Sequence, residues 1–504
     1  MMILRSVCIG TVFFISAASF AGAETYDPTT LTASAIFAKA GAAYGTLEPA
    51  AYVETTLTHT PSVDDTTVTV MQGDDYRTTV TGGGFTDSYG YYQKQSWTQD
   101  YNGVTTLRNN FRTKVDPNDL ALQHPDDPKY NVHVLGITQT GPRQYVVELN
   151  PPGGYDEFRY YDVKTSLLTA TVAYTRDRHR HVTDYTDYRN TFGEAVPFRI
   201  HSYDGRPEND TVTTVASYLR ADGTADVSIP PGRALYTYTG AQPLKLPARF
   251  TPEGIIVRAV VNGRGLDFLL DSGADGLVID PGVAHQLGFA PYGRTSATIG
   301  GGDVDFGELR IPVMSIGNLD MHDVVFDATG FEQDAGDAKA VGLIGFDFFA
   351  NGIIAIDFKH QTVELYSRDA FDPKAMGLSG LPLQLDDGVP RTDVWVEGVH
   401  GHFLVDTGSF AMLLYRDYVH KLPSAVVTAQ SQILTVGGTM PVSVVNISDL
   451  IFGGVKYRTA QAMEPNISTF DIADYDGVLG RDVLAGYQNY FDYGDGMLFV
   501  KPDL

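Results

Sequence analysis

The chain has 504 residues, of which 19% are charged, and its formal net charge at pH 7 is −25. This acidic excess argues against a nucleic-acid partner and against docking on anionic lipid, because both are themselves negatively charged. At roughly 150 residues per domain the length predicts about three units. The 52 Gly and 29 Tyr, with few charges, favour a mainly β protein.

The first 23 residues have the pattern of a secretory signal peptide. A positively charged start leads into an apolar stretch at 7–20 and a small-residue cleavage site at 21–23. We therefore expect an exported protein whose mature chain begins at Glu24. The single cysteine, Cys8, lies in this segment, so the mature chain has no disulfide and no thiol nucleophile. Export without disulfides suits the periplasm or exterior of a bacterium.

Residues 24–220 are expected to form an antiparallel β domain. An Ala-rich stretch at 31–45 predicts a helix, and short alternating runs between turn signals then predict a meander of many strands. The predicted strands are 66–71, 77–80, 144–149, 157–161, 168–174, 183–189, 196–203 and 211–219.

Part of this region resembles the half-barrel of periplasmic lipoprotein-carrier proteins. The similarity is one of pattern, over 161–168, 184–189 and 197–200. It implies a curved sheet with an apolar concave face, and therefore an apolar ligand, an apolar peptide or the chain's own partner domain as its occupant.

The segment Arg176-Asp-Arg-His-Arg-His181 places His179 and His181 on one face of a strand, because alternate residues of a strand share a face. A metal site and a solvated charged hairpin both fit this pattern. The hairpin is favoured, because no third ligand lies nearby in the sequence. We expect no metal and no cofactor.

Residues 221–244 are rich in Gly and Pro and show little periodicity, which predicts a linker. A pro-segment-like strand that covers a site further along the chain is the alternative, and the sequence leaves it open.

The rest of the chain carries one pattern twice. An apolar run followed by Asp, a hydroxyl residue, Gly and a small residue occurs at Asp271-Ser-Gly-Ala274 and Asp406-Thr-Gly-Ser409. A Gly-apolar-apolar-Gly segment begins 71 residues after each Asp, and the whole pattern recurs at an offset of 135 residues. One such motif alone would be an ordinary turn. The repeat predicts a tandem duplication, with lobe 1 at 245–374 and lobe 2 at 378–504.

These motifs resemble the retropepsin-like branch of the aspartic peptidases. The resemblance implies a two-lobed all-β unit and assigns Asp271 and Asp406 as the catalytic pair. Two carboxyls at a pseudo-twofold axis share one proton, so one can activate a water while the other polarises the scissile carbonyl. Active-site support is assigned to Ser272, Gly273, Thr407, Gly408 and Ser409; flaps over the substrate to Ile299, Gly300, Gly301, Val436, Gly437 and Gly438; and closing segments to Ile344, Gly345, Leu479 and Gly480.

Two expectations concern differences between the lobes. The Ser409 hydroxyl is expected to stabilise an ionised Asp406, whereas Ala274 offers Asp271 no such bond. Viral members pair an acid with an Arg within one subunit. Here Asp275 and Arg481 stand in different lobes, so either they meet across the interface or each is solvated separately, and the second is favoured.

The sequence therefore predicts a monomeric, exported aspartic endopeptidase with a polypeptide substrate, an N-terminal β domain and no stable membrane insertion. The alternative is a lipid- or peptide-binding envelope protein whose protease-like half is inactive. A zymogen that removes its own N-terminal domain also remains open.

Overall fold

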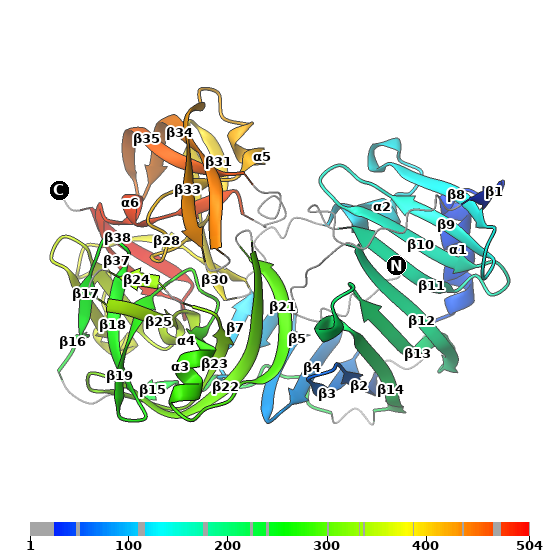
Figure 1. Ribbon diagram of the computed structural model, residues 1–504, viewed down its shortest axis with the longest axis horizontal. Helices are drawn as coiled ribbons and strands as arrows, with labels where there is room; N and C mark the ends of the chain where they lie inside the picture. Colours follow the sequence, from blue (N-terminus) through cyan, green and yellow to red (C-terminus); the bar gives the residue numbers. More distant parts are fainter. Residues whose placement is uncertain are drawn as a thin grey trace.

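The structure, a computed structural model, is mainly β, and its described residues form four sheets (Figure 1). This confirms the predicted fold class. The predicted signal peptide, His179 and the flap residues Gly300, Gly301, Val436 and Gly437 lie outside the described residues. Those described are 25–46, 51–108, 116–174, 180–221, 225–237, 241–299, 302–331, 333–335, 338–386, 388–435, 438–466 and 475–502.

The N-terminal region forms one antiparallel sheet of 14 strands, in the order β1-β8-β9-β10-β11-β12-β13-β14-β2-β3-β4-β5-β6-β7. The strands are β1 (Tyr26–Asp27), β2 (Ala51–His59), β3 (Asp64–Gln72), β4 (Asp75–Gly82), β5 (Phe85–Tyr92), β6 (Gln95–Gln99), β7 (Thr105–Arg108), β8 (Val132–Thr138), β9 (Gln144–Leu149), β10 (Asp156–Asp162), β11 (Leu168–Tyr174), β12 (Arg180–Thr191), β13 (Glu194–Tyr203) and β14 (Thr211–Arg220).

One helix, α1 (Ala33–Tyr44), packs on this sheet. Thr32 caps it by accepting a hydrogen bond from the Ala35 N–H. Its apolar side, including Ile36, packs with Val147 and Leu149 of β9 in a small core of its own. The predicted helix and all eight predicted strands are confirmed. Short helical segments follow at α2 (Pro117–Gln123), η1 (Pro128–Tyr130) and η2 (Pro207–Asn209).

Lobe 1 is built on a sheet in the order β15-β23-β20-β25-β19-β18-β22-β21, with β17 beside β18 and β24 beside β25. Its elements are β15 (Tyr236–Thr237), β17 (Ala248–Phe250), β18 (Ile255–Val261), β19 (Arg264–Leu270), β20 (Leu277–Ile279), α3 (Pro281–Gln286), β21 (Tyr292–Ile299), β22 (Gly302–Ile316), β23 (Leu319–Thr329), β24 (Gln333–Ala335), β25 (Ala338–Ile344) and α4 (Phe346–Ala350).

Lobe 2 repeats this plan in the order β29-β30-β31-β36-β32-β35-β34-β33. Its elements are β29 (Gln384–Asp386), β30 (Val389–Val396), β31 (Val399–Val405), β32 (Leu413–Leu414), α5 (Arg416–Val419), β33 (Val426–Thr435), β34 (Gly438–Phe452), β35 (Val455–Pro465), β36 (Gly477–Leu479) and α6 (Arg481–Leu484).

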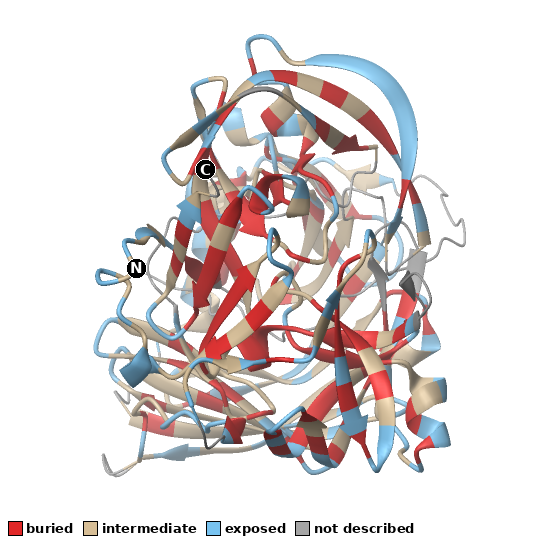
Figure 2. Ribbon diagram, turned by 90° about the vertical axis from the view of Figure 1, so that its left-hand side faces the viewer, coloured by how far each residue is buried: buried red, intermediate tan, exposed pale blue. Residues whose placement is uncertain are grey.

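A six-stranded sheet in the order β16-β27-β26-β37-β38-β28 joins the lobes, through antiparallel pairing of β26 with β37. One apolar core runs through both lobes and contains Phe268, Phe349, Phe403 and Phe491. Figure 2 colours the buried residues of the chain red. The elements are β16 (Leu244–Lys245), β26 (Ile353–Asp357), β27 (Thr362–Tyr366), η3 (Arg368–Ala370), β28 (Ser379–Pro382), β37 (Tyr487–Asp492) and β38 (Met497–Pro502).

The segment expected as a linker, 221–244, contains a strand that adds to lobe 1. Residues Tyr236 and Thr237 form β15, which pairs with Met321 and Asp320 of β23. Tyr236 is buried in the lobe core, and its hydroxyl donates to the Phe348 carbonyl. This segment therefore contributes core packing as well as a connection.

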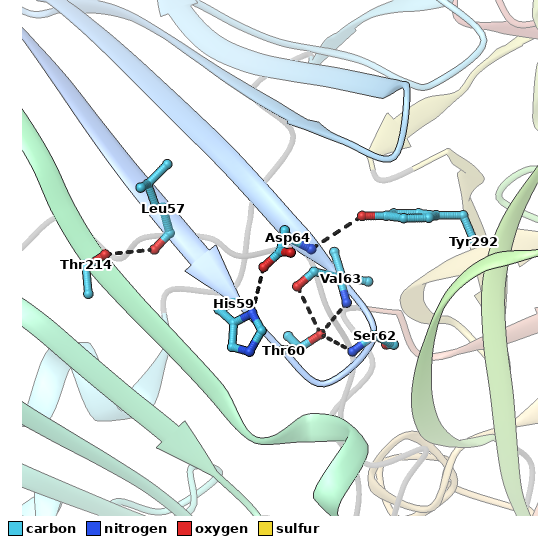
Figure 3. A network of polar contacts seen from close by, with 8 residues as sticks. All are labelled: Leu57, His59, Thr60, Ser62, Val63, Asp64, Thr214 and Tyr292. Carbon is cyan, nitrogen blue, oxygen red and sulfur yellow. Dashed lines mark hydrogen bonds and ion pairs between the residues drawn. The ribbon is translucent and has the colours of Figure 1, made fainter.

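The N-terminal sheet contacts lobe 1 through the turn between β2 and β3 (Figure 3). The Asp64 N–H donates to the Tyr292 hydroxyl at 3.3 Å. Ser62 Oγ accepts from the Arg294 N–H at 2.9 Å and lies 3.0 Å from the Arg294 carbonyl. Thr60 Oγ1 accepts from the Ser62 N–H within the turn, which fixes its shape. A turn of the N-terminal region thus lies on β21 of lobe 1.

No helix in the described part of the chain is long and apolar enough to cross a membrane.

Candidate active site

The two repeated Asp residues stand at equivalent ends of equivalent strands. Asp271 follows β19, and its N–H donates to the Ile344 carbonyl at 3.0 Å. Asp406 follows β31, and its N–H donates to the Leu479 carbonyl at 3.0 Å. In each lobe the strand before the Asp lies parallel to the strand of the closing segment, β25 or β36. The two apolar runs fold as buried strands, and the carboxyl that follows each strand occupies the equivalent position in its lobe.

The closing segments also fix the far side of each Asp loop. The Phe346 N–H donates to the Ala274 carbonyl at 3.0 Å, and the Arg481 N–H donates to the Ser409 carbonyl at 2.9 Å. A Cβ at Gly345 would lie 2.6 Å from the Ala274 carbonyl oxygen, so this close approach requires glycine.

Ser272 and Thr407, which the sequence assigns to active-site support, form hydrogen bonds from one lobe to the other. Ser272 Oγ donates to the Val405 carbonyl at 2.8 Å, and Thr407 Oγ1 donates to the Leu270 carbonyl at 3.0 Å. Each hydroxyl also accepts from the other residue's N–H, at 3.0 Å in both directions. Both side chains are fully buried. Four reciprocal bonds therefore lock one loop to the other.

The two carboxyls face the neighbouring lobe's glycine. A Cβ at Gly273 would lie 2.6 Å from Asp406 Cγ, and a Cβ at Gly408 would lie 2.6 Å from Asp271 Cγ. Any side chain at either glycine would displace the opposite carboxyl, so the two glycines are what allows the carboxyls to approach one another across the axis.

Asp271 and Asp406 have different electrostatic surroundings. Burial, followed by the negative charge of Asp406, raises the pKa of Asp271 well above its usual range. One oxygen of Asp406 accepts two backbone N–H bonds, from Gly408 at 2.7 Å and from Ser409 at 2.9 Å. The corresponding oxygen of Asp271 accepts the Gly273 N–H at 2.9 Å. The Gly408 backbone also lowers the pKa of Asp271, but burial and the charge of Asp406 raise this pKa by more, which favours a proton on Asp271.

The expected role of the Ser409 hydroxyl is wrong. Ser409 Oγ donates to the Ala411 carbonyl at 2.8 Å, and it is the backbone N–H of Ser409 that reaches Asp406. The lobes do differ as expected in their donors to the Asp pair, but the difference lies in the main chain.

The Arg481 side chain is partly buried and bonds to the other lobe instead of standing in solvent. Its guanidinium donates to the carbonyls of Thr251, at 3.3 Å, and Glu253, at 2.7 Å, in the other lobe. Arg481 therefore ties the lobe 2 closing segment to the turn before β18.

Tyr493 is a supporting residue that the sequence analysis did not assign to the site. Its buried hydroxyl donates to the Ser272 carbonyl at 2.8 Å. The ring stacks with Phe346 and Phe349 at centroid distances of 5.5 Å and 5.4 Å. Tyr493 follows β37, so the six-stranded sheet that joins the lobes holds the loop that contains Asp271 through this hydrogen bond. In the sequence, Tyr493 follows a run of aromatic and apolar residues, which is the pattern of an ordinary core residue and gives no sign of a role in the site.

The two predicted flap hairpins are in different surroundings. The hairpin β21–β22 of lobe 1 is held by the N-terminal region: the Ser296 N–H donates to Asn209 Oδ1 at 3.3 Å, and Asn209 Nδ2 donates to the Ser296 carbonyl at 3.4 Å. Both residues are buried. In the lobe 2 hairpin, β33 is exposed along most of its length, and Leu434 is 66% exposed (Figure 2).

We expect Asn209→Ala to loosen the lobe 1 hairpin selectively. The substitution removes three buried hydrogen bonds, two with Ser296 and one to Asp204 Oδ2 at 2.8 Å. Each is worth about 1 kcal/mol, so amide exchange around Ser296 should speed up by about tenfold or more. Hydrogen exchange with mass spectrometry would measure this, with β33 as the internal reference. Asn190→Ala, at an exposed turn of the same N-terminal sheet, is the matched control. Equal exchange in all three proteins would contradict the proposed restraint.

A second buried carboxyl pair lies where the N-terminal region meets lobe 1. Burial, followed by the charge of Asp100, raises the pKa of Asp347 well above its usual range. Asn102 bridges the parts: its Nδ2 donates to Asp347 Oδ2 at 3.0 Å, and its Oδ1 accepts from the Val325 N–H at 2.8 Å. A Cβ at Gly276 would lie 3.7 Å from Asp347 Oδ2, so the pair lies directly beneath the first Asp loop.

Comparison with known proteins agrees with this geometry. Residues 257–348 and 392–483 both match the model of the aspartyl protease family. The match therefore occurs twice in tandem, once in each lobe. A crystal structure of a LolA-superfamily protein from Nitrosomonas europaea is a structural neighbour of the N-terminal region, at 15% identity and a TM-score of 0.28, covering 38% of this chain and 95% of that chain. No curated protein matches the sequence.

Proposed function

We propose that this chain is an exported aspartic endopeptidase that uses Asp271 and Asp406 together on one water molecule. The observation that carries the proposal is the reciprocal locking of the two Asp loops by Ser272 and Thr407. That arrangement holds two carboxyls against each other despite their repulsion, which costs stability and serves no evident structural purpose.

The roles follow from the unequal surroundings. Asp406, with two N–H donors on one oxygen, acts as the base that takes a proton from the water. Asp271, which holds the shared proton, donates it in a hydrogen bond to the scissile carbonyl oxygen and so stabilises the developing negative charge. The water oxygen attacks the carbonyl carbon, and the proton gained by Asp406 passes to the leaving amine.

The test is cleavage of a mixed peptide library by the purified protein, read by mass spectrometry with and without pepstatin. We expect internal cleavage that pepstatin suppresses. Absence of cleavage from acidic to neutral pH would instead favour the alternative, a lipid- or peptide-binding protein with an inactive protease-like half.

Export and the role of the N-terminal sheet complete the proposal. A processed chain should begin at Glu24, which N-terminal sequencing of protein recovered outside the cytoplasm would check. A sequence that still began at Met1 would contradict it. We also propose the N-terminal sheet as the place where an apolar ligand or peptide binds.

A further inference from the structure

The hairpin β30–β31 of lobe 2 gathers three side chains that metal ions commonly bind. His400 and His402 alternate along β31 and so share one face. The register pairs His402 with Asp393 and His400 with Trp395 across the hairpin. Asp393 therefore lies directly beside His402 and diagonally beside His400, on the same face.

The geometry brings the three side chains to one point. His400 Nε2 lies 3.0 Å and His402 Nδ1 lies 2.8 Å from the same carboxylate oxygen, Oδ1 of Asp393. One ligand atom from each residue lies within 4.8 Å of the others. The two imidazole rings stand nearly perpendicular, with centroids 5.0 Å apart, so each presents a different nitrogen to the same position.

The shared oxygen has an unusual environment. Asp393 Oδ1 is buried, yet it accepts no hydrogen bond of good geometry from the part of the chain that the structure describes. A buried carboxylate oxygen normally has such a partner. Both ring nitrogens lie at ion-pair distance from an oxygen that accepts no hydrogen bond from the described residues, which suits a cation held between the three atoms better than a simple ion pair.

We propose that Asp393, His400 and His402 form a binding site for a divalent transition-metal ion of the zinc type. Zinc binds His nitrogen and carboxylate oxygen at about 2.0–2.2 Å, so tetrahedral ligand atoms stand about 3.3 Å apart. The two nitrogen–oxygen separations, 3.0 Å and 2.8 Å, need to open by about 0.3 Å and about 0.5 Å to reach this value. Three protein ligands leave a coordination position for water or another ligand, and imidazole with carboxylate suits zinc, copper and nickel.

The site also has a place in the fold. His402 lies four residues before Asp406 on the same strand, and its N–H donates to Asp476 Oδ2 at 3.0 Å. The Asp476 N–H donates in turn to the His402 carbonyl at 2.7 Å, just before the closing segment of lobe 2 begins. A bound ion would therefore fasten β30 to β31 at the outer end of the strand that carries Asp406. The proposal does not depend on peptidase activity.

The experiment is a titration of the metal-free full chain with Zn²⁺ by calorimetry, and with Cu²⁺ by fluorescence. The chain has two tryptophans, and Trp395 lies 5.0 Å from His400, whereas Trp97 is buried in the N-terminal sheet. We expect one strong Zn²⁺ site, and Cu²⁺ quenching that corresponds to Trp395.

Variants decide whether the site is the one proposed. His400→Ala and Asp393→Asn should each weaken Zn²⁺ binding by at least tenfold and reduce the Cu²⁺ quenching. His400 is 40% exposed at its side chain, so its replacement removes little packing. His360→Ala is the control, since His360 lies 2.7 Å from one carboxylate, that of Asp357, and belongs to no three-residue cluster among the described residues. Zn²⁺ should raise the Tm of wild type and of the control, but not of His400→Ala. Equal affinity in wild type and His400→Ala would overturn the proposal.

Discussion

Replacing either Asp271 or Asp406 by Asn is expected to abolish peptide hydrolysis while the chain still folds. General acid–base catalysis contributes about 10²–10⁴-fold to rate, and this site has a single pair to supply both roles, so we expect a loss of at least that size in kcat. Asn is similar in size to Asp, and the loops are locked by Ser272 and Thr407, whose bonds do not involve the carboxyls.

The two variants should differ in stability. Asp271 has the raised pKa, so at neutral pH its ionisation is costly in the folded state, and Asp271→Asn should raise the Tm. Asp406 receives two N–H bonds that favour its charge, so Asp406→Asn should raise the Tm less or lower it. Initial rates on a cleaved peptide and thermal unfolding at neutral pH measure both effects. Near wild-type turnover in either variant would refute the paired mechanism.

The same asymmetry predicts how activity depends on pH. The pair gives a bell-shaped profile of kcat/KM, whose lower limb marks loss of the base form and whose upper limb marks loss of the shared proton. Because the Ser409 hydroxyl bonds to Ala411, Ser409→Ala should leave the acidic limb where it is in wild type. A hydroxyl that stabilised ionised Asp406, as expected from the sequence, would instead give an upward shift of that limb on its removal.

The active-site residues could be predicted from the sequence because their motifs are repeated. The Asp motifs, the closing segments and the supporting roles of Ser272 and Thr407 could be predicted because the same pattern occurs twice at one offset. The strands β2 and β5–β8 were missed, since runs such as 85–92 alternate polar residues with Tyr and Gly rather than with aliphatic residues. Pattern reading finds strands by their apolar face, and these strands are mostly only partly buried.

Contacts between segments that are distant in the chain could not be predicted from the sequence. No pattern in the neighbouring residues indicates that Arg481 donates to the carbonyls of Thr251 and Glu253, or that Tyr493 donates to the carbonyl of Ser272. The metal site shows the same limit. A His-x-His pair was noticed at His181 and set aside for want of a third ligand. At His400 and His402 the third ligand, Asp393, comes from the neighbouring strand, so only the register reveals it.

Raising the pH is expected to weaken the junction between the N-terminal region and lobe 1. Besides Asp100 and Asp347, Asp327 lies in this cluster, and burial followed by the charge of Asp275 raises its pKa to about 8. Burial also raises the pKa of Asp87 to about 6. Further acidic groups that face the cluster are Asp65 and Glu308. Asn102 Nδ2 donates to Asp347 Oδ2 across the junction, and a proton between Asp100 and Asp347 adds a second side-chain hydrogen bond there. Loss of that proton turns this bond into a repulsion between two buried charges.

The sign follows from the direction of these shifts. A carboxyl whose pKa is higher in the folded than in the unfolded chain keeps its proton only when folded, between those two values. Its stabilising effect is complete below the unfolded pKa of about 4 and is lost as the pH rises through the folded value, about 8 for Asp327. Each such group lowers the free energy of unfolding by about 1.4 kcal/mol per pH unit in that window.

Thermal unfolding of wild type and Asp347→Asn across this window tests the prediction. The Asn variant cannot ionise, so its Tm should fall less steeply with pH, and it should exceed wild type at the alkaline end. Asp320→Asn is the control, because Asp320 is exposed on the same strand as Asp327 and bonds to Ser315.

The junction lies next to Gly276, so when the junction loosens as the pH rises, amide exchange in the loop that contains Asp271 should become faster. Identical pH dependence in all three proteins would mean that the carboxyl pair does not control how the two parts hold together.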